Sequence, residues 1–278
     1  MSSTPLAPIV KWVGGKRQLL PEISKRLPND LGTYFEPFVG GGAVLLATQP
    51  ETAVVSDLNY ELVNLYRVAR DNPTGLLELA RSYPNEPDFY YELRGLDRDE
   101  VAFWALTPLQ RAARMWFLNR TGFNGMYRVN SQGYQNVPFG RYKNPSFDEA
   151  NLFAVSEYLQ GVEILHSDYK DAVFSAVAGD FVYFDPPYDP VSPTATFTAY
   201  SSDGFTRESQ RELMELCVSL DERGVRFMLS NSNTDFIRDL YSGFNVHIVE
   251  ARRAINSVGS KRGAVEEVLV TNYGKGEV

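Results

Sequence analysis

The tetrapeptide Asp185-Pro186-Pro187-Tyr188 carries the most specific chemistry in this sequence. A carboxylate and a backbone carbonyl in such a turn can both accept hydrogen bonds from one exocyclic amine. The two prolines hold the turn at low entropic cost because their φ angles are already set. Tyr188 offers a ring on which a planar base can stack. A rigid turn after a buried strand would also explain the prolines, but the acid and the flanking aromatic residues favour a base-binding site.

A second candidate site is the run Gly40-Gly41-Gly42, which follows the apolar run 34–38 and precedes an apolar helical segment. Glycines there let the backbone approach a bound ligand closely. Their spacing is not the Gly-x-Gly-x-x-Gly of dinucleotide-binding proteins, and an ordinary glycine turn is the alternative. Asp57 closes the next predicted strand, where an acid accepts hydrogen bonds from ribose hydroxyls or caps a helix. Together, the glycines and Asp57 predict a nucleoside pocket.

The segment Lys11-Trp12-Val13-Gly14-Gly15-Lys16 superficially resembles a phosphate-binding loop. No glycine lies five residues before Gly15, and Arg17 follows Lys16 where a Ser or Thr should coordinate magnesium. Taken alone, the segment is therefore interpreted as a basic turn, and a phosphate-binding NTPase is disfavoured.

The elements that position these residues follow from short apolar runs that end in turn residues. Such runs predict buried strands of a mostly parallel sheet, and they lie at 34–38, 53–57, 181–185 and 226–231. Helical spacing of apolar residues predicts helices at 61–70 and 207–220, the second with Thr206 as N-cap. Strands that alternate with helices predict a doubly wound α/β sheet.

The stretch 71–153 interrupts this alternation. Its first half is predicted to be helical, especially 110–118, and 121–145 is rich in Gly, Asn, Tyr, Pro and Arg, which indicates loop and β-hairpin. We therefore expect two domains: a catalytic domain formed by 1–70 and 154–278, and an inserted domain, 71–153, that recognises the target.

Composition bounds the class of protein. Of the 278 residues, 44% are apolar and 22% are charged, which is typical of a globular protein. Because there is no apolar run long enough to cross a bilayer and no secretory pattern at the N-terminus, we expect a cytoplasmic protein that makes no membrane contact. One cysteine and two histidines argue against a disulfide framework and a metal site.

The net charge of −8 would ordinarily argue against a nucleic-acid partner. Its distribution argues otherwise. Residues 111–143 include six basic residues and no acid, and 251–263 include four basic residues and no acid. A solvated surface would explain either run alone, whereas two such runs in an acidic chain suggest a localised anionic partner.

The ordered set of motifs resembles a known family. Segments 11–16, 35–42 and 185–188, in this order, resemble the α-group of amino-methyltransferases that methylate adenine N6 in DNA, and most closely the Dam (DNA adenine methylase) proteins that modify GATC. Further Dam-like stretches lie at 118–125, 136–143, 196–200 and 252–255. The resemblance covers nearly the whole chain and implies a Rossmann-like methyltransferase sheet with an inserted, mainly helical target-recognition domain.

The resemblance also implies the ligands. Asp185, Pro186, Pro187 and Tyr188 would receive a flipped-out adenine. S-adenosylmethionine would be bound by Trp12, Lys16, Pro37, Phe38, Gly40, Asp57, Asp168, Tyr169 and Asp185.

Double-stranded DNA is the implied partner, and we expect a monomer to bind it. Arg128 matches an arginine that reads guanine through O6 and N7, Lys11 a lysine on the first guanine, and Phe123 an aromatic residue that enters the base stack. Met126 and Pro138 match thymine contacts. The remaining DNA candidates are Arg120, Asn124, Arg141, Lys143 and Arg252. Phe instead of Tyr at 123 and Met instead of Leu at 126 depart from the family pattern, so GATC is an inference from the resemblance.

The implied reaction is direct methyl transfer to a flipped base, without a covalent enzyme intermediate. Cys217 lies at core spacing in a predicted helix, which disfavours a thiolate nucleophile. Three alternatives stay open: a restriction-modification methylase with another recognition sequence, methylation of cytosine N4, and a DNA-binding regulator without catalysis. Asp185 favours adenine over cytosine, because a Ser at this position would favour N4.

Overall fold

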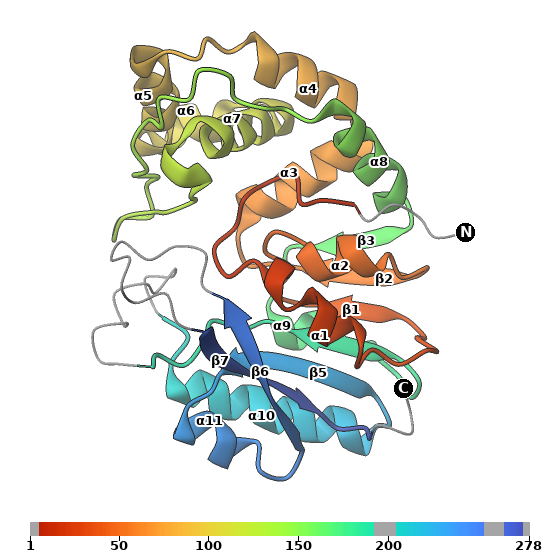
Figure 1. The fold of residues 1–278 in the computed structure, drawn as a ribbon. Coiled ribbons are helices and arrows are strands. Elements are labelled where there is room, and N and C mark those ends of the chain that lie inside the picture. The colour runs from red at the N-terminus through yellow and green to blue at the C-terminus, as the bar shows by residue number, and fades with distance from the viewer. Residues whose placement is uncertain (1–5, 192–203, 253–263, 275–278) are drawn as a thin grey trace. The chain divides into compact units, whose positions relative to one another are not determined.

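The computed structural model describes residues 6–191, 204–252 and 264–274. Its strands are β1 (Tyr34–Glu36), β2 (Ala53–Ser56), β3 (Val162–Leu165), β4 (Phe181–Phe184), β5 (Arg226–Ser232), β6 (Asn245–Arg252) and β7 (Ala264–Thr271). They form a seven-stranded sheet in the order β3-β2-β1-β4-β5-β7-β6 (Figure 1). β1 pairs in parallel with β2 and β4, β4 pairs in parallel with β5, and β7 is antiparallel to β5 and β6. The predicted α/β class and its four predicted strands are confirmed.

The helices are α1 (Leu20–Ser24), α2 (Ala43–Thr48), α3 (Tyr60–Asp71), α4 (Pro73–Ser82), α5 (Pro87–Gly95), α6 (Glu100–Ala105), α7 (Pro108–Thr121), α8 (Glu149–Leu159), α9 (Tyr169–Ala172), α10 (Arg207–Glu222) and α11 (Asp235–Leu240). Short 3-10 turns occur at η1 (Lys16–Gln18), η2 (Leu96–Arg98) and η3 (Phe123–Gly125). Thr206 caps α10 in a capping box with Ser209, as the sequence predicts in part. The helices predicted around 61–70, 110–118 and 207–220 are confirmed.

The chain forms two compact units. Unit 1 comprises residues 1–15, 39–49 and 56–167, and unit 2 comprises residues 16–38, 50–55 and 168–278. The expected division into 1–70 with 154–278 and a separate 71–153 stays a prediction.

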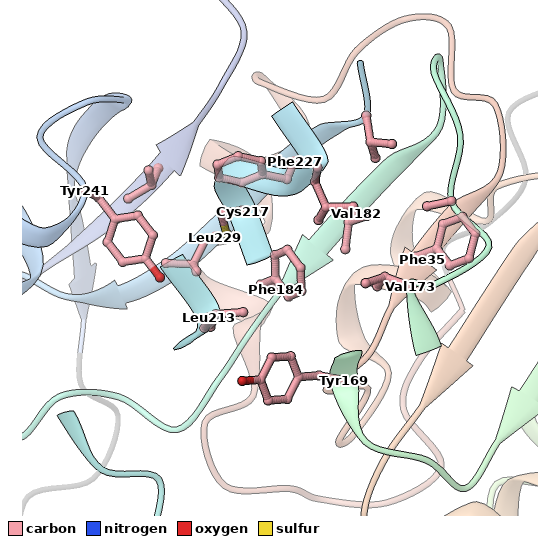
Figure 2. Packing of buried hydrophobic residues seen from close by; sticks show 14 of the residues in the cluster. Phe35, Tyr169, Val173, Val182, Phe184, Leu213, Cys217, Phe227, Leu229 and Tyr241 are labelled. Atoms are coloured by element: carbon pink, nitrogen blue, oxygen red, sulfur yellow. The ribbon is translucent and has the colours of Figure 1, made fainter. Parts of the chain in front are cut away.

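The hydrophobic core of unit 2 lies between its strands and the helices α9, α10 and α11 (Figure 2). α10 contributes the stripe Leu213, Cys217 and Leu220, which packs with Phe184 and Phe227 of neighbouring strands. The spacing of this stripe places it on one face of the helix. Cys217 is fully buried, and burial raises the pKa of its thiol well above the ordinary value. Cys217 is thus a core residue, as its spacing predicts.

The centre of unit 1 is α7, whose apolar residues are buried against α3, α4 and α5 (Figure 1). Two arginines of the basic run 111–143 lie inside this helical layer. Arg111 contacts Glu61 at 2.9 Å and Arg114 contacts Asp97 at 3.1 Å, with about a twentieth of each arginine side chain exposed. These two charges are neutralised internally, so the run contributes less positive surface than its composition predicts.

We expect Arg111→Met to lower the free energy of unfolding by about 3 kcal/mol, because it leaves the Glu61 carboxylate buried without its partner. Arg141→Met is the matched control, since Arg141 is exposed, and its effect should stay within about 0.5 kcal/mol. Urea unfolding measures both. Equal effects of the two substitutions would contradict the internal role of Arg111.

Candidate active site and nucleic-acid interface

Asp185 follows β4, whose four residues are all fully buried, and its side chain is 18% exposed. Its Oδ1 lies 2.7 Å from Lys16 Nζ and accepts a hydrogen bond from Ser230 Oγ at 2.9 Å. Burial raises the pKa of the Asp185 carboxyl, while Lys16 and Ser230 counteract the increase. Both contacts fall on one oxygen, and the described residues donate no hydrogen bond to Oδ2. The carboxylate thus keeps an acceptor for a further donor.

Tyr188 has contacts through both its hydroxyl and its ring. Its hydroxyl donates to Glu267 Oε2 at 2.8 Å, and Lys16 Nζ lies 4.7 Å from its ring centroid. Burial raises the Tyr188 pKa well above its ordinary value, so the hydroxyl remains a donor. The ring therefore has a defined plane beside Asp185 and Lys16, which suits a stacking role.

Buried amides hold the end of the turn. Gln210 Nε2 donates to the Pro187 carbonyl at 2.8 Å, and Asn231 Nδ2 donates to Gln210 Oε1 at 3.1 Å. Asn231 Oδ1 also accepts from the Asp189 backbone N–H at 3.0 Å. Among the described residues nothing donates to the Pro186 carbonyl. The turn therefore presents one carbonyl that the protein occupies and one that it leaves for another donor.

The sequence does not predict that four further residues belong to this site: Ser230, Asn231, Gln210 and Glu267. One signal was available for two of them, because the predicted strand 226–231 ends in polar residues on an otherwise apolar run. Polar side chains at the carboxyl end of a central strand lie where ligands bind in such sheets. Gln210 and Glu267 carry no comparable sequence signal.

Unit 2 also contains the aromatic and acidic candidates for the cofactor. Phe38 stacks on Tyr169 with ring centroids 5.3 Å apart and meets Phe184 edge-on. Asp168 is the N-cap of α9 and accepts from the Lys170 backbone N–H at 3.0 Å. Tyr169 Oη is buried and has no hydrogen-bond partner among the described residues, which makes it available to a ligand. Pro37 lies buried directly after β1.

Unit 1 brings Trp12, Gly40 and Asp57 together. Asp57 Oδ2 accepts from the Gly40 backbone N–H at 3.0 Å. Gly40 has a φ of +47°, and a Cβ there would lie 2.8 Å from the Trp12 ring, which itself stacks on Tyr127. Only glycine satisfies both the backbone angle and this close approach. Burial raises the pKa of Asp57.

The helix-capping alternative for Asp57 is wrong. Asn59 is the N-cap of α3 and accepts from the Leu62 backbone N–H at 3.1 Å. Asp57 instead accepts from the backbone N–H groups of Gly40 and Asn59, so it fixes the glycine loop.

Within unit 1, Asn119 positions Lys11 beside the loop that contains η3. The Lys11 backbone N–H donates to Asn119 Oδ1, and Asn119 Nδ2 donates to the carbonyls of Lys11 and Gly125, all at 2.9 Å. Gly125 has a φ of +64°, and a Cβ there would collide with the Lys11 side chain. The structure thus places Lys11 next to the predicted DNA-binding loop.

The loop presents an exposed aromatic ring. Phe123 is 48% exposed, and its backbone N–H donates to the Pro138 carbonyl at 2.8 Å. Asn124 takes a left-handed conformation, and its backbone N–H donates to the Tyr142 hydroxyl at 2.9 Å. Pro138 is also exposed and Met126 is half-buried.

Arg128 precedes a short hairpin formed by a bridge between Val129 and Gln135, as predicted for this region. Arg128 is exposed, and its Nε donates to Asn136 Oδ1 at 2.7 Å. Its Nη2 also donates to the Asn136 carbonyl, at 3.4 Å, whereas Nη1 forms no hydrogen bond with the described residues and could donate to a base edge.

The other predicted DNA candidates differ from one another. Arg141 and Lys143 are exposed, whereas Arg120 is partly buried and donates to the Ile9 carbonyl at 2.6 Å. Arg252 ends β6, but its side chain lies outside the described residues, as do the motifs at 196–200 and 253–255.

Comparison with known proteins identifies the family. Residues 12–255 match the family of D12 class N6 adenine-specific DNA methyltransferases. A type II methyltransferase of Lactococcus lactis, M1.LlaDCHI, is 45% identical over 97% of this chain and 96% of its own length. DNA adenine methylase of Escherichia coli K12 is 38% identical over 94% and 93%. The chain therefore belongs to the D12 class of N6 adenine-specific DNA methyltransferases, and the resemblance seen in the sequence is confirmed.

Among solved structures, precorrin-6y C5,15-methyltransferase of Geobacter metallireducens superposes with a TM-score of 0.37 and 9% identity, covering 96% of this chain and 98% of that one. Likeness at this level carries no inference. In the part of the chain that the structure describes, no helix combines the length and apolar character needed to span a membrane. The described residues also contain no group of three His, Cys, Asp or Glu side chains arranged to bind a metal ion.

Proposed function

We propose that this methyltransferase binds S-adenosylmethionine, flips an adenine out of double-stranded DNA at GATC, and methylates N6 of that base at Asp185-Pro186-Pro187-Tyr188. The observation that carries the proposal is the division of acceptors at this turn. Asp185 Oδ1 and the Pro187 carbonyl are engaged by the protein, whereas Asp185 Oδ2 and the Pro186 carbonyl have no donor among the described residues. An adenine amine has two N–H groups to donate to that pair.

Asp185 and Pro186 would orient the amine for attack. The amine is a poor nucleophile because its lone pair is delocalised into the ring. Hydrogen bonds from its two protons to fixed acceptors favour a pyramidal nitrogen, and positioning then supplies much of the rate. S-adenosylmethionine, when bound, supplies an electrophilic methyl group. Tyr188 would stack on the base and offset part of the cost of flipping it.

The candidate residues for the cofactor fit its chemistry. In unit 1, the Asp57 carboxylate is fixed by the glycine loop and suits ribose hydroxyls, with the Trp12 ring beside that loop. In unit 2, the unpartnered Tyr169 hydroxyl can donate to a purine nitrogen, and the Phe38 ring offers a stacking surface. Asp168 and Pro37 complete the set predicted from the sequence.

Lys16 is best explained here as the counter-ion of Asp185, given its 2.7 Å contact. Its predicted cofactor contact is compatible with that role. A protonated Asp185 loses acceptor strength, so activity should fall as pH decreases through its raised pKa. Lys16 has the largest influence that holds this pKa down. Removing the ammonium raises the pKa further, so the loss of activity must begin at higher pH.

We therefore expect Lys16→Met to move the acid limb of the kcat profile to higher pH. Arg17→Met is the control, because Arg17 is the exposed neighbour. Steady-state methylation measured across the acid range tests this. An acid limb identical to that of the unmodified enzyme would exclude the counter-ion role.

For DNA, we propose that unit 1 supplies Lys11, Phe123 and Arg128 to the major groove and the base stack. Their support is the set of Asn119 hydrogen bonds that hold Lys11, the exposed ring of Phe123 and the exposed Arg128 side chain, whose Nη1 forms no hydrogen bond with the described residues. Arg141 and Lys143 are exposed cations suited to phosphates.

The test of GATC methylation is plasmid protection. Plasmid prepared with the active protein in a host without adenine methylation should resist a nuclease that cuts only unmethylated GATC, and become sensitive to one that requires the methylated site. Methylated plasmid that remains fully sensitive to the first nuclease would mean another recognition sequence.

A further inference from the structure

Two buried hydroxyl groups form a hydrogen-bond chain that ends at Asp185. Tyr183 Oη lies 3.1 Å from Ser230 Oγ, and Ser230 Oγ lies 2.9 Å from Asp185 Oδ1. Tyr183 belongs to β4 and Ser230 to β5, which pair in parallel, and both side chains are fully buried. This hydrogen-bond chain therefore lies in the interior of unit 2.

Each hydroxyl of this hydrogen-bond chain donates its proton in the direction of Asp185. A hydroxyl has one proton to donate, and Ser230 has Asp185 Oδ1 at 2.9 Å but the Phe184 carbonyl only at 3.4 Å, a poor distance for a hydroxyl donor. Ser230 thus donates to Asp185 and accepts from Tyr183. Burial raises the Tyr183 pKa well above its ordinary value, so Tyr183 keeps its proton. Aligned donors of this kind polarise one another.

Packing alone does not require these hydroxyls. β4 is otherwise Phe-Val-Phe and fully buried, so a Phe at 183 would fill nearly the same volume without a polar atom. A buried hydroxyl costs free energy unless it is hydrogen-bonded. Tyr183 donates to Ser230 and Ser230 donates to Asp185, which relates both residues to the turn at Asp185.

We propose that Ser230 and Tyr183 are positioning residues for adenine methylation. Ser230, oriented by Tyr183, occupies Asp185 Oδ1 so that Oδ2 alone faces the substrate amine. Gln210 does the same on the backbone by occupying the Pro187 carbonyl and leaving that of Pro186. The proposal rests on the proposed role of Asp185.

Other groups around Asp185 set its charge. Lys16 of η1 contacts the same oxygen, and Tyr188 of the turn is hydrogen-bonded to Glu267 of β7. Tyr183 also lies in the field of the Glu36 carboxylate from β1. Of these, Lys16 acts on Asp185 more strongly than Ser230 does. Loss of Ser230 should therefore move the acid limb in the same direction as loss of Lys16, but less far.

The test is Ser230→Ala, with Ser232→Ala on the same strand as its control, since the Ser232 side chain is also buried. We expect kcat of Ser230→Ala to fall about tenfold on the acid limb of the pH profile and less on its plateau, since one hydrogen bond to a charged group is lost. The KM for DNA and the Kd for S-adenosylmethionine should change little, because the Ser230 side chain is fully buried. A pH profile equal to that of Ser232→Ala would overturn the proposal.

Tyr183→Phe tests whether Tyr183 acts on Asp185 through Ser230. Because Tyr183 acts through Ser230, the single variant Tyr183→Phe should have a lower kcat than the unmodified enzyme. In the Ser230→Ala background the same substitution should cause no further decrease. The double variant contains neither hydroxyl, so it also avoids a stranded buried donor that could impair folding. A further decrease caused by Tyr183→Phe in that background would show that Tyr183 acts by another route.

Carbon-13 NMR titration of the Asp185 carboxyl separates this proposal from the proposed function. The label is assigned with Asp185→Asn, and no turnover is needed. A titration midpoint that is higher in Ser230→Ala than in Ser232→Ala supports the positioning role even if adenine is not the substrate. Equal midpoints in an active enzyme would exclude the role while leaving adenine methylation intact.

Discussion

Asp185→Ala should reduce DNA methylation by about 10²–10³-fold or more, because it removes the acceptor that we propose orients the amine. Binding of S-adenosylmethionine should be retained in part, since the glycine loop and Asp57 do not depend on Asp185. Radiolabelled methyl transfer measures the first quantity, and equilibrium binding of the labelled cofactor measures the second.

Asp171→Ala is the matched control, because Asp171 is an exposed acid of the short helix α9. It should keep the activity of the unmodified enzyme. Unchanged turnover in Asp185→Ala would refute the site. Loss of cofactor binding together with activity would place Asp185 mainly in the cofactor site.

Arg128→Ala should mainly weaken discrimination at one guanine. A bidentate arginine contact to O6 and N7 contributes about 1–3 kcal/mol, so preference for the correct base at that position should fall by roughly 5- to 150-fold. Methylation rates on duplexes that differ at single base pairs measure this preference. At the other base pairs of the recognition sequence, the ratio of the rates on correct and substituted duplexes should change far less.

Lys143→Ala is the comparison, because Lys143 is an exposed cation that suits a phosphate. It should weaken binding to all duplexes alike and lower the salt dependence. If Arg128→Ala instead behaved in that way, Arg128 would be a phosphate contact, and recognition of guanine would have to be assigned to another residue.

Several structural elements could be predicted from the sequence because their signals are local. Strands β1, β2, β4 and β5 are short apolar runs with turn residues at their ends, and burial on both faces of a parallel sheet requires that pattern. The turn at Asp185 can also be predicted, since two prolines directly after a strand restrict its conformation. The sequence does not predict strands β3, β6 and β7; β6 and β7 pair antiparallel with each other, and β7 joins the sheet through its antiparallel register with β5.

The parts that escaped prediction depend on long-range contacts. Ser230 contacts Asp185 across 45 residues of sequence, and the polar end of the strand 226–231 indicates a position near a ligand but not this contact. The basic run 111–143 predicts more positive surface than the structure has, because composition does not show that Arg111 and Arg114 pair internally with Glu61 and Asp97. Asp57 was a possible helix N-cap in the sequence. The N-cap is Asn59, because α3 begins at Tyr60, two residues later than a cap at Asp57 requires.

The most direct measurement is the identity of the methylated nucleoside. Duplex DNA treated with the protein and S-adenosylmethionine is digested to nucleosides, which are separated and weighed by mass spectrometry, in parallel with DNA treated with Asp185→Ala. We predict N6-methyldeoxyadenosine with the unmodified protein and almost none with the variant. N4-methyldeoxycytidine, or equal N6-methyldeoxyadenosine from both proteins, would contradict adenine chemistry at the Asp185 turn.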